Sequence, residues 1–238
     1  MNVKKIIIIS VIFVLIVGYT YFKTHYAVID NEIYKTDITY LHIFSLDDSE
    51  IKEINKCTEI EKMFVSKAVE NSVSGFTDFH NLNDLTLLNC EISGNDTEKI
   101  SKFDNLNTFS TLMTDIDLQG FNNNMVFDIV FFYSKIKNFK ALSECSSLKK
   151  LAVYHSEIAD NCIVTEDGKY IMKDSSVFKN FDYTEELRIF VNEIEDISGI
   201  LEMDSLNVFE VYKGTVSEDN VKLLEDNGIS VVYNDTNE

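Results

Sequence analysis

A repeated pattern of apolar residues runs through most of this 238-residue chain and constrains its fold more than any other feature. The template has apolar residues at positions 1, 4, 6 and 11 and a small or amide residue at position 9. Copies begin at residues 38, 60, 82, 106, 126, 148, 184 and 206, so most lie 20 to 24 residues apart and one interval is 36 residues. Copies in phase at one period predict a stack of equivalent coils. The clearest copy contains Leu82, Leu85, Leu87, Cys90 and Ile92.

Three copies depart from the template at one position. Thr111 stands at position 6 of its copy, Thr184 stands at position 1, and Glu70 breaks the end of the copy that begins at residue 60. In a strand, positions 4 and 6 point into the core, and positions 3, 5 and 7 point the other way. No coil can bury its apolar residues alone, so we expect the strands to stack into one parallel sheet. Eight strands at ~4.8 Å give a sheet about 35 Å across.

The template resembles LxxLxLxxN/CxL, the motif of the leucine-rich-repeat family, over roughly residues 34 to 233. The segments 34–41 and 48–52 resemble the start of repeat arrays on bacterial surface proteins. The resemblance implies an α/β leucine-rich-repeat solenoid of about eight coils with a curved parallel sheet. Position 9 is often Ser, Thr, Gly or Ala where the family has Asn, so we expect less regular turns, with water or small side chains in place of the amide.

The first 27 residues form a separate segment by composition. Lys4 and Lys5 precede an apolar run from Ile6 to Val17 that extends to Phe22. Seventeen helical residues span about 25 Å, enough to cross a thinned bilayer. We expect residues 6–22 to be an uncleaved signal anchor, with the repeat domain, residues 28–233, outside the cell. A cleaved signal peptide is the alternative.

The 36-residue interval predicts an insertion at residues 163–183. Its first part, residues 163–172, alternates like a β-hairpin that turns at Asp167-Gly168. We expect the hairpin to project from the solenoid, either as a binding element or as a tolerated surface loop.

The C-terminal part is typical of a cap for the repeat array. Ser217 is placed to cap a helix that ends at Asn227-Gly228, and residues 229–233 are expected to form a last edge strand. Residues 234–238 are a polar tail.

Charge and cysteine spacing exclude several classes of function. The net charge of −19 argues against nucleic-acid binding. The repeat register keeps the four cysteines apart or out of phase, which predicts free thiols. No CxxC, HExxH, GxSxG or Walker motif is present, so we expect no enzyme activity, no metal and no cofactor.

The register also predicts where a partner would bind. Position 7 points away from the core and is apolar or aromatic in seven of eight copies. An apolar stripe on an exposed sheet usually marks an interaction site. We therefore expect a non-catalytic extracellular module that holds a protein, or a cell-wall glycan, on its concave face. The alternative is a structural surface protein that self-associates through the same stripe. The candidate partner-binding residues are Phe44, Phe64, Leu88, Leu112, Phe132, Tyr133, Tyr154, Phe190 and Tyr212.

Overall fold

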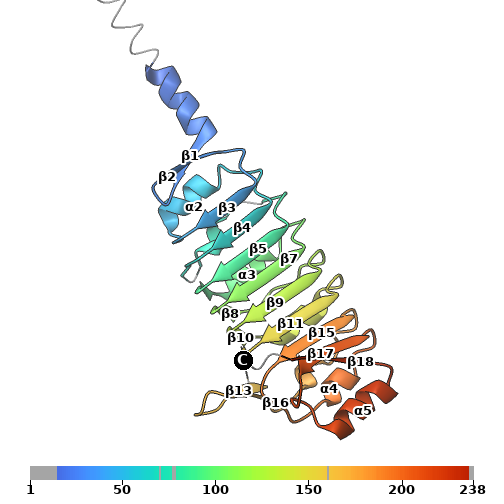
Figure 1. The fold of residues 1–238 in the computed structure, drawn as a ribbon. Helices are drawn as coiled ribbons and strands as arrows, with labels where there is room; N and C mark the ends of the chain where they lie inside the picture. Colours follow the sequence, from blue (N-terminus) through green and yellow to red (C-terminus); the bar gives the residue numbers. More distant parts are fainter. Residues whose placement is uncertain (1–14, 70, 77–78, 160, 236–238) are drawn as a thin grey trace, which may run out of the picture.

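The computed structural model describes residues 15–69, 71–76, 79–159 and 161–235. Within them the chain forms an elongated solenoid of stacked coils, with the N-terminal helix at one end and α5 (Glu218–Asp226) at the other (Figure 1). Each coil contributes one strand to the same sheet, and the return segment of each coil lies behind that sheet. The repeat of the sequence is therefore the repeat of the fold.

The main sheet has nine parallel strands, in the order of the chain. Equivalent template positions pair across it, as in Leu85 with Phe109 and Phe109 with Ile129, so positions 4 and 6 form continuous buried columns. The predicted leucine-rich-repeat solenoid fold with one long parallel sheet is thus confirmed, including the last edge strand. The strands are β3 (Tyr40–Ile43), β4 (Lys62–Val65), β5 (Asp84–Leu88), β7 (Thr108–Leu112), β9 (Asp128–Phe132), β11 (Lys150–Tyr154), β15 (Glu186–Phe190), β17 (Val208–Tyr212) and β18 (Ser230–Asn234).

Short helices and phenylalanine rings close the far side of the core. Phe79 contacts Phe103 edge to face, and Phe139 packs against Phe178 and Phe181 in the following return segments. All five rings are buried. Successive coils therefore stack through aromatic contacts behind the sheet as well as through the strands. The helical segments are α2 (Asp48–Ile54), η1 (Val73–Gly75), α3 (Gly94–Ile100), η2 (Phe139–Glu144), η3 (Ser176–Phe178) and α4 (Ser198–Leu201).

A second, four-stranded parallel sheet follows the turn of the middle coils. It comprises β6 (Glu91–Ile92), β8 (Asp115–Asp117), β10 (Lys135–Lys137) and β12 (Glu157–Ile158). The isoleucines of position 11 pair in register across it, and they are buried. Position 11 therefore belongs to a regular strand.

Small hydroxyl side chains replace the family's Asn at position 9 and form a regular ladder. The backbone N–H of Cys90 donates to Thr114 Oγ1 (3.3 Å), that of Thr114 to Ser134 Oγ (3.3 Å), and that of Ser134 to Ser156 Oγ (3.0 Å). Each hydroxyl in turn donates to the position-7 carbonyl of its own coil, as Ser134 does to Phe132 (3.1 Å). The expected small side chains are therefore present at position 9, but the turns of these middle coils are regular, because one hydroxyl accepts and donates within the space an amide would fill.

Position 8 precedes this ladder and adopts a left-handed backbone conformation. Asn89, Met113, Tyr133 and His155 have φ between 41° and 51°. Asn tolerates this region, whereas Met, Tyr and His rarely occupy it. The tight turn out of the main sheet therefore strains the backbone at three of these four residues.

The insertion forms a hairpin that joins the solenoid. Strands β13 (Cys162–Val164) and β14 (Tyr170–Met172) pair antiparallel, and Gly168 has φ 81° at the turn between them. Strand β14 also pairs in parallel with β16 (Glu193–Ile194). Met172 is fully buried. The hairpin tip projects (Figure 1). Its second strand, β14, pairs in parallel with β16, as the strands of the small sheet pair with one another.

The N-terminal helix covers residues 15–25 of the described chain and leads directly into β1 (Tyr26–Ile29), which pairs antiparallel with β2 (Glu32–Lys35). The backbone N–H of Thr36 donates to the His25 carbonyl (3.0 Å), which ties the hairpin to the end of the helix. Residues 6–14 of the expected anchor lie outside the described residues. Among those described, no helix combines the length and the apolar character needed to cross a membrane.

The C-terminal cap follows the expected pattern. Ser217 Oγ accepts the backbone N–H of Asn220 (3.3 Å) at the start of α5, and Gly228 has φ 85° after its end. Leu224 is buried against the last coil. The helix therefore covers the core that the final coil would otherwise expose.

Candidate functional site

The nine-stranded sheet has one face against the core and one face toward solvent, which we call the open sheet face. Burial alternates along most of the strands, so that Asp84, Thr86 and Leu88 of β5 are half-buried on either side of two buried leucines. All nine predicted site residues lie on this face or at its rim. Phe44 is 61% exposed, Tyr133 is 45% exposed and Phe190 is fully buried. The half-buried members are Phe64, Leu88, Leu112, Phe132, Tyr154 and Tyr212.

Aromatic rings gather on the C-terminal half of the open sheet face. We call them the aromatic cluster. Phe132 lies 5.2 Å from Tyr154 between ring centroids, Tyr154 stacks on Phe190 at 4.5 Å, and Phe190 lies 4.8 Å from Tyr212. Equivalent positions of neighbouring strands are in register, so each ring meets the next along the sheet. The members are Phe132, Tyr133, Tyr154, His155, Tyr170, Phe190 and Tyr212.

Phe190 is the member whose expected exposure is wrong. Its ring contacts Tyr154 on one side and Tyr212 on the other, and no part of the residue is accessible to solvent. The next residue, Val191, is also buried, and Asn192 is exposed instead of filling position 9. The backbone N–H of Tyr170 donates to Asn192 Oδ1 (2.8 Å), so the inserted hairpin changes the turn of this coil.

His155 lies at the centre of the rim of the aromatic cluster. Its ring stacks on Tyr133 at 5.3 Å and on Tyr212 at 5.7 Å, and it meets Tyr170 at 5.5 Å. Nε2 of His155 shares a hydrogen bond with the Tyr212 hydroxyl at 3.3 Å. Burial lowers the pKa of His155. The neutral imidazole is therefore favoured in the folded protein.

Tyr170 and Met113 belong to this surface but were not among the predicted residues. Tyr170 comes from the inserted hairpin, whose placement against the sheet no repeat register could supply. Met113 occupies position 8, as Tyr133 does, and is 57% exposed. The equivalence of these two positions was the signal that could have found Met113.

Opposite charges balance one another beside the aromatic cluster. Lys150 Nζ lies 3.2 Å from Glu186, Glu186 also contacts Arg188, and Arg188 Nε lies 3.0 Å from Glu210. Burial raises the pKa of Asp128 on the adjoining strand, although Lys150 and Arg188 oppose that effect. This part of the face therefore offers aromatic surface bordered by paired charges, which suits partner binding better than acid–base chemistry.

A second group of rings lies at the N-terminal end of the open sheet face. His42 contacts Phe44 at 4.3 Å and meets Phe64 edge to face at 4.8 Å, and its Nε2 shares a hydrogen bond with Ser66 Oγ at 2.8 Å. Strands β5 and β7, which carry Leu88 and Leu112, separate this group from the aromatic cluster. The predicted site residues therefore form two groups joined by an aliphatic strip.

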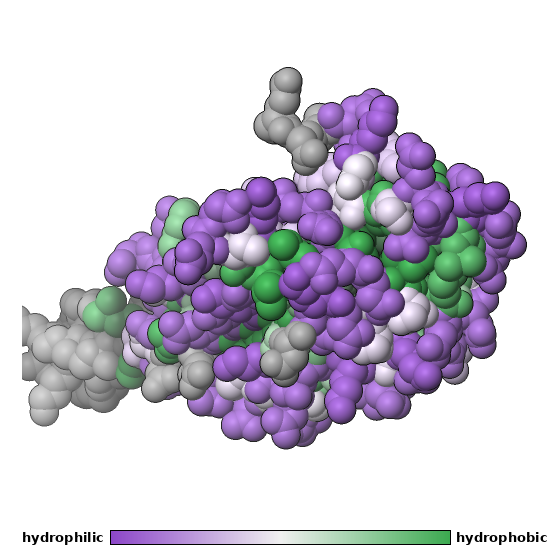
Figure 2. Space-filling view, turned by 90° about the horizontal axis from the view of Figure 1, so that it is seen from below, coloured by the Kyte–Doolittle hydropathy of each residue, from purple (hydrophilic) through white to green (hydrophobic). Residues whose placement is uncertain are grey.

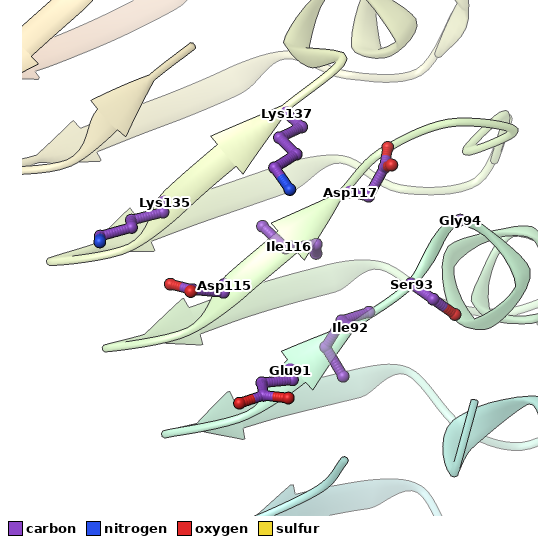
Figure 3. A pocket seen from close by; sticks show the side chains of 9 residues that line it. All are labelled: Glu91, Ile92, Ser93, Gly94, Asp115, Ile116, Asp117, Lys135 and Lys137. Atoms are coloured by element: carbon purple, nitrogen blue, oxygen red, sulfur yellow. The ribbon is translucent and has the colours of Figure 1, made fainter. Parts of the chain in front are cut away.

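Figure 2 shows hydrophobic residues exposed in a band that hydrophilic residues interrupt and surround. A hollow of ≈ 240 Å³ lies along the small sheet, where Glu91, Asp115 and Lys135 occupy paired positions (Figure 3). Its lining mixes acidic and basic side chains without a convergent set.

In the part of the chain that the structure describes, the titratable groups offer no metal centre or reactive thiol. Among the described residues, no three His, Cys, Asp or Glu side chains converge to hold a metal ion. Cys57, Cys90, Cys145 and Cys162 are free and buried. Burial raises the pKa of the first three thiols to about 11 and that of Cys162 to about 12. At neutral pH these thiols are protonated and shielded.

Comparison with known proteins shows which solved structures have a similar fold. No family model matches the chain, and no curated protein matches its sequence. Crystal structures of two Listeria monocytogenes internalins superpose on it: inlF with a TM-score of 0.56 and 16% identity, and internalin C2 with a TM-score of 0.54 and 15% identity. Each match covers 86% of this chain, but only 58% of inlF against 86% of internalin C2. The chain therefore has the leucine-rich-repeat fold of the Listeria internalins.

Proposed function

We propose that this protein is a non-catalytic binding module that holds a protein ligand against the open sheet face. The observation that carries the proposal is the aromatic cluster, where Tyr133 is 45% exposed and Phe132, Tyr154 and Tyr212 remain half-buried on a face with no covering element among the described residues. Aromatic side chains dominate binding energy at protein interfaces because they bury large areas at low entropic cost.

Position at a bacterial cell surface is the second part of the proposal. Residues 6–22 would hold the chain in the cell membrane by a single pass, with residues 28–233 extracellular. What supports it is the sequence, in which Lys4 and Lys5 precede the apolar run. Fold similarity to internalins agrees with a surface location.

The test uses the full chain and a variant that removes one exposed ring and two half-buried rings of the aromatic cluster, Tyr133→Ser with Phe132→Ser and Tyr154→Ser. Phe190 stays unchanged because it is buried and its loss would destabilise the fold. A matched control, Phe127→Ser with Tyr183→Ser, removes two exposed rings that do not belong to the aromatic cluster. Urea unfolding establishes that both variants are folded before binding is measured.

The expected result is a ligand retained from bacterial surface extract by the wild type and the control but lost by the triple variant. Protease treatment of the extract should abolish retention, whereas survival of the ligand would identify a glycan. Equal retention by the triple variant would exclude the aromatic cluster as the binding surface. Retention only of further copies of the chain, lost in the triple variant, would favour self-association through this face.

A further inference from the structure

Among the described residues, strand β18 is the last strand of the nine-stranded sheet and its outer edge is unpaired. Within the described residues it pairs with β17 on one side and with no strand on the other. Its sequence, Ser-Val-Val-Tyr-Asn, contains no charged side chain, and Val232 and Tyr233 are 41% and 45% exposed. Edge strands usually carry charges, proline or a bulge that prevents further pairing. This edge lacks all three.

The hydrogen-bond register shows which peptide groups face outward. The backbone N–H of Ser230 donates to the Asn207 carbonyl of the preceding coil (2.8 Å), and Ser230 pairs with Val208. In a parallel ladder, alternate residues bond to the same neighbour. The peptide groups of Ser230, Val232 and Asn234 therefore face β17, whereas those of Val231 and Tyr233 face away from it.

We propose that a second copy of the chain adds its own β18 antiparallel to this edge, on a two-fold axis that passes beside Val232. The two outward-facing residues are then opposite one another, Val231 against Tyr233 of the second copy and Tyr233 against Val231. Such pairs exchange both their N–H and C=O groups in an antiparallel ladder. One register thus satisfies all four outward N–H groups of the pair.

The strand's own composition favours a second copy over another partner. In this register Val232 faces Val232 and Ser230 faces Asn234, so no charge meets a like charge although each chain carries a net charge of −19. A two-fold interface requires such self-complementarity. The result is one continuous sheet in which the two open sheet faces lie on the same side.

Two variants of one residue separate backbone pairing from side-chain contact. Tyr233→Pro removes an outward N–H and leaves the bonds to β17, a position where an edge strand tolerates proline. Tyr233→Ala removes the ring but keeps the N–H. By sedimentation of the full chain, Tyr233→Pro should raise the dimer dissociation constant at least about tenfold. Tyr233→Ala should retain most of the dimer. Equal loss in both variants, or a wild type that stays monomeric at about 100 μM, would overturn the proposal.

Cysteine cross-linking tests the register itself. The four native thiols are buried, so an introduced thiol is the reactive one. Val232→Cys should form a covalent dimer on mild oxidation because the two Cα atoms would lie about 4.5 Å apart. Ser230→Cys should not, because its counterpart would be roughly 13 Å away. Cross-linking of both variants alike, or of neither, would exclude this pairing. Either result is also expected if the chains associate through the N-terminal segment instead.

Discussion

The phenol ring of Tyr133 stacks on the imidazole of His155, with ring centroids 5.3 Å apart and planes 14° from parallel. Both residues occupy position 8 of their coils, with φ of 49° and 41°. A left-handed backbone costs roughly 1–2 kcal/mol for a residue with a side chain. The stacked rings offset part of that cost. Backbone strain therefore coincides with the exposed rim of the aromatic cluster.

Relief of this strain can be tested at a neighbouring position without aromatic contacts. Met113 has φ 50° and is exposed, and Asn tolerates that conformation better. Met113→Asn should raise the free energy of unfolding by up to about 1 kcal/mol. Tyr133→Asn gives the same relief but loses the ring contacts with Phe132 and His155, so it should leave stability unchanged or lower. Urea unfolding measures both, and a destabilised Met113→Asn would contradict the strain argument.

The ladder at position 9 predicts that loss of one hydroxyl lowers the free energy of unfolding more than loss of an exposed hydroxyl does. Ser134 Oγ accepts the Thr114 N–H (3.3 Å) and bonds Thr111 Oγ1 (2.9 Å), and all three residues are buried. Ser134→Ala leaves those groups without their partner and should lower the free energy of unfolding by about 1–3 kcal/mol. Ser143→Ala, which removes a hydroxyl bonded to the Lys140 carbonyl (2.8 Å), is the control and should change it by less than about 0.5 kcal/mol.

Burial of His155 predicts a pH dependence of stability. Its pKa in the folded chain is lowered from 6.5, so the unfolded chain binds the proton first as the pH falls. The contribution of His155 to stability is therefore complete above pH 6.5 and is lost as the pH falls through the lowered folded pKa. Unfolding free energies at neutral pH and at a pH near the folded pKa should differ less in His155→Gln than in the wild type. If the two unfolding free energies differ by as much in His155→Gln as in the wild type, groups other than His155 cause the pH dependence of stability.

Gly199 is required by a close approach between coils. A Cβ there would lie 2.0 Å from the Ser175 carbonyl oxygen, and the Gly199 N–H donates to Ser175 Oγ (2.9 Å). Gly199→Ala should lower the free energy of unfolding by about 3 kcal/mol or more, since backbone must move. Gly214 has φ 87° but open space where a Cβ would lie, so Gly214→Ala should show backbone strain alone, roughly 1–2 kcal/mol. Thermal melts that rank the two variants in the opposite order would refute this reasoning.

Most of the solenoid follows from apolar spacing in the sequence. Positions 4 and 6 predict buried columns because a strand alternates its faces, and the structure pairs those positions in register from β3 to β17. The site column at position 7 follows from the same alternation. The predicted solvent exposure of position 7 is wrong at Phe190, because Tyr154 and Tyr212 cover its ring.

The remaining features depend on contacts that no spacing encodes. The turn at position 9 could not be predicted as regular, because its backbone N–H is paired only when the next coil supplies a hydroxyl oxygen at 3.0–3.3 Å. The pairing of β14 with β16 depends on how an insertion packs, which a 22-residue repeat does not describe. Tyr170 lies in the aromatic cluster because its strand, β14, pairs with β16.

The hydroxyl ladder ends at Ser156. In the next coil Asn192, the residue at position 9, is exposed to solvent, and the Val191 carbonyl accepts a hydrogen bond from Thr215 Oγ1 (3.1 Å). The coils that begin at residues 82, 106, 126 and 148 are coupled to one another by both the sheet and the ladder, whereas the coupling between the coils on either side of the insertion lacks the ladder. Nearest-neighbour coupling sets how far unfolding spreads along a repeat array. The junction after Ser156 is thus where the array should divide into two cooperative units, and hydrogen exchange should find the C-terminal coils opening independently of the rest.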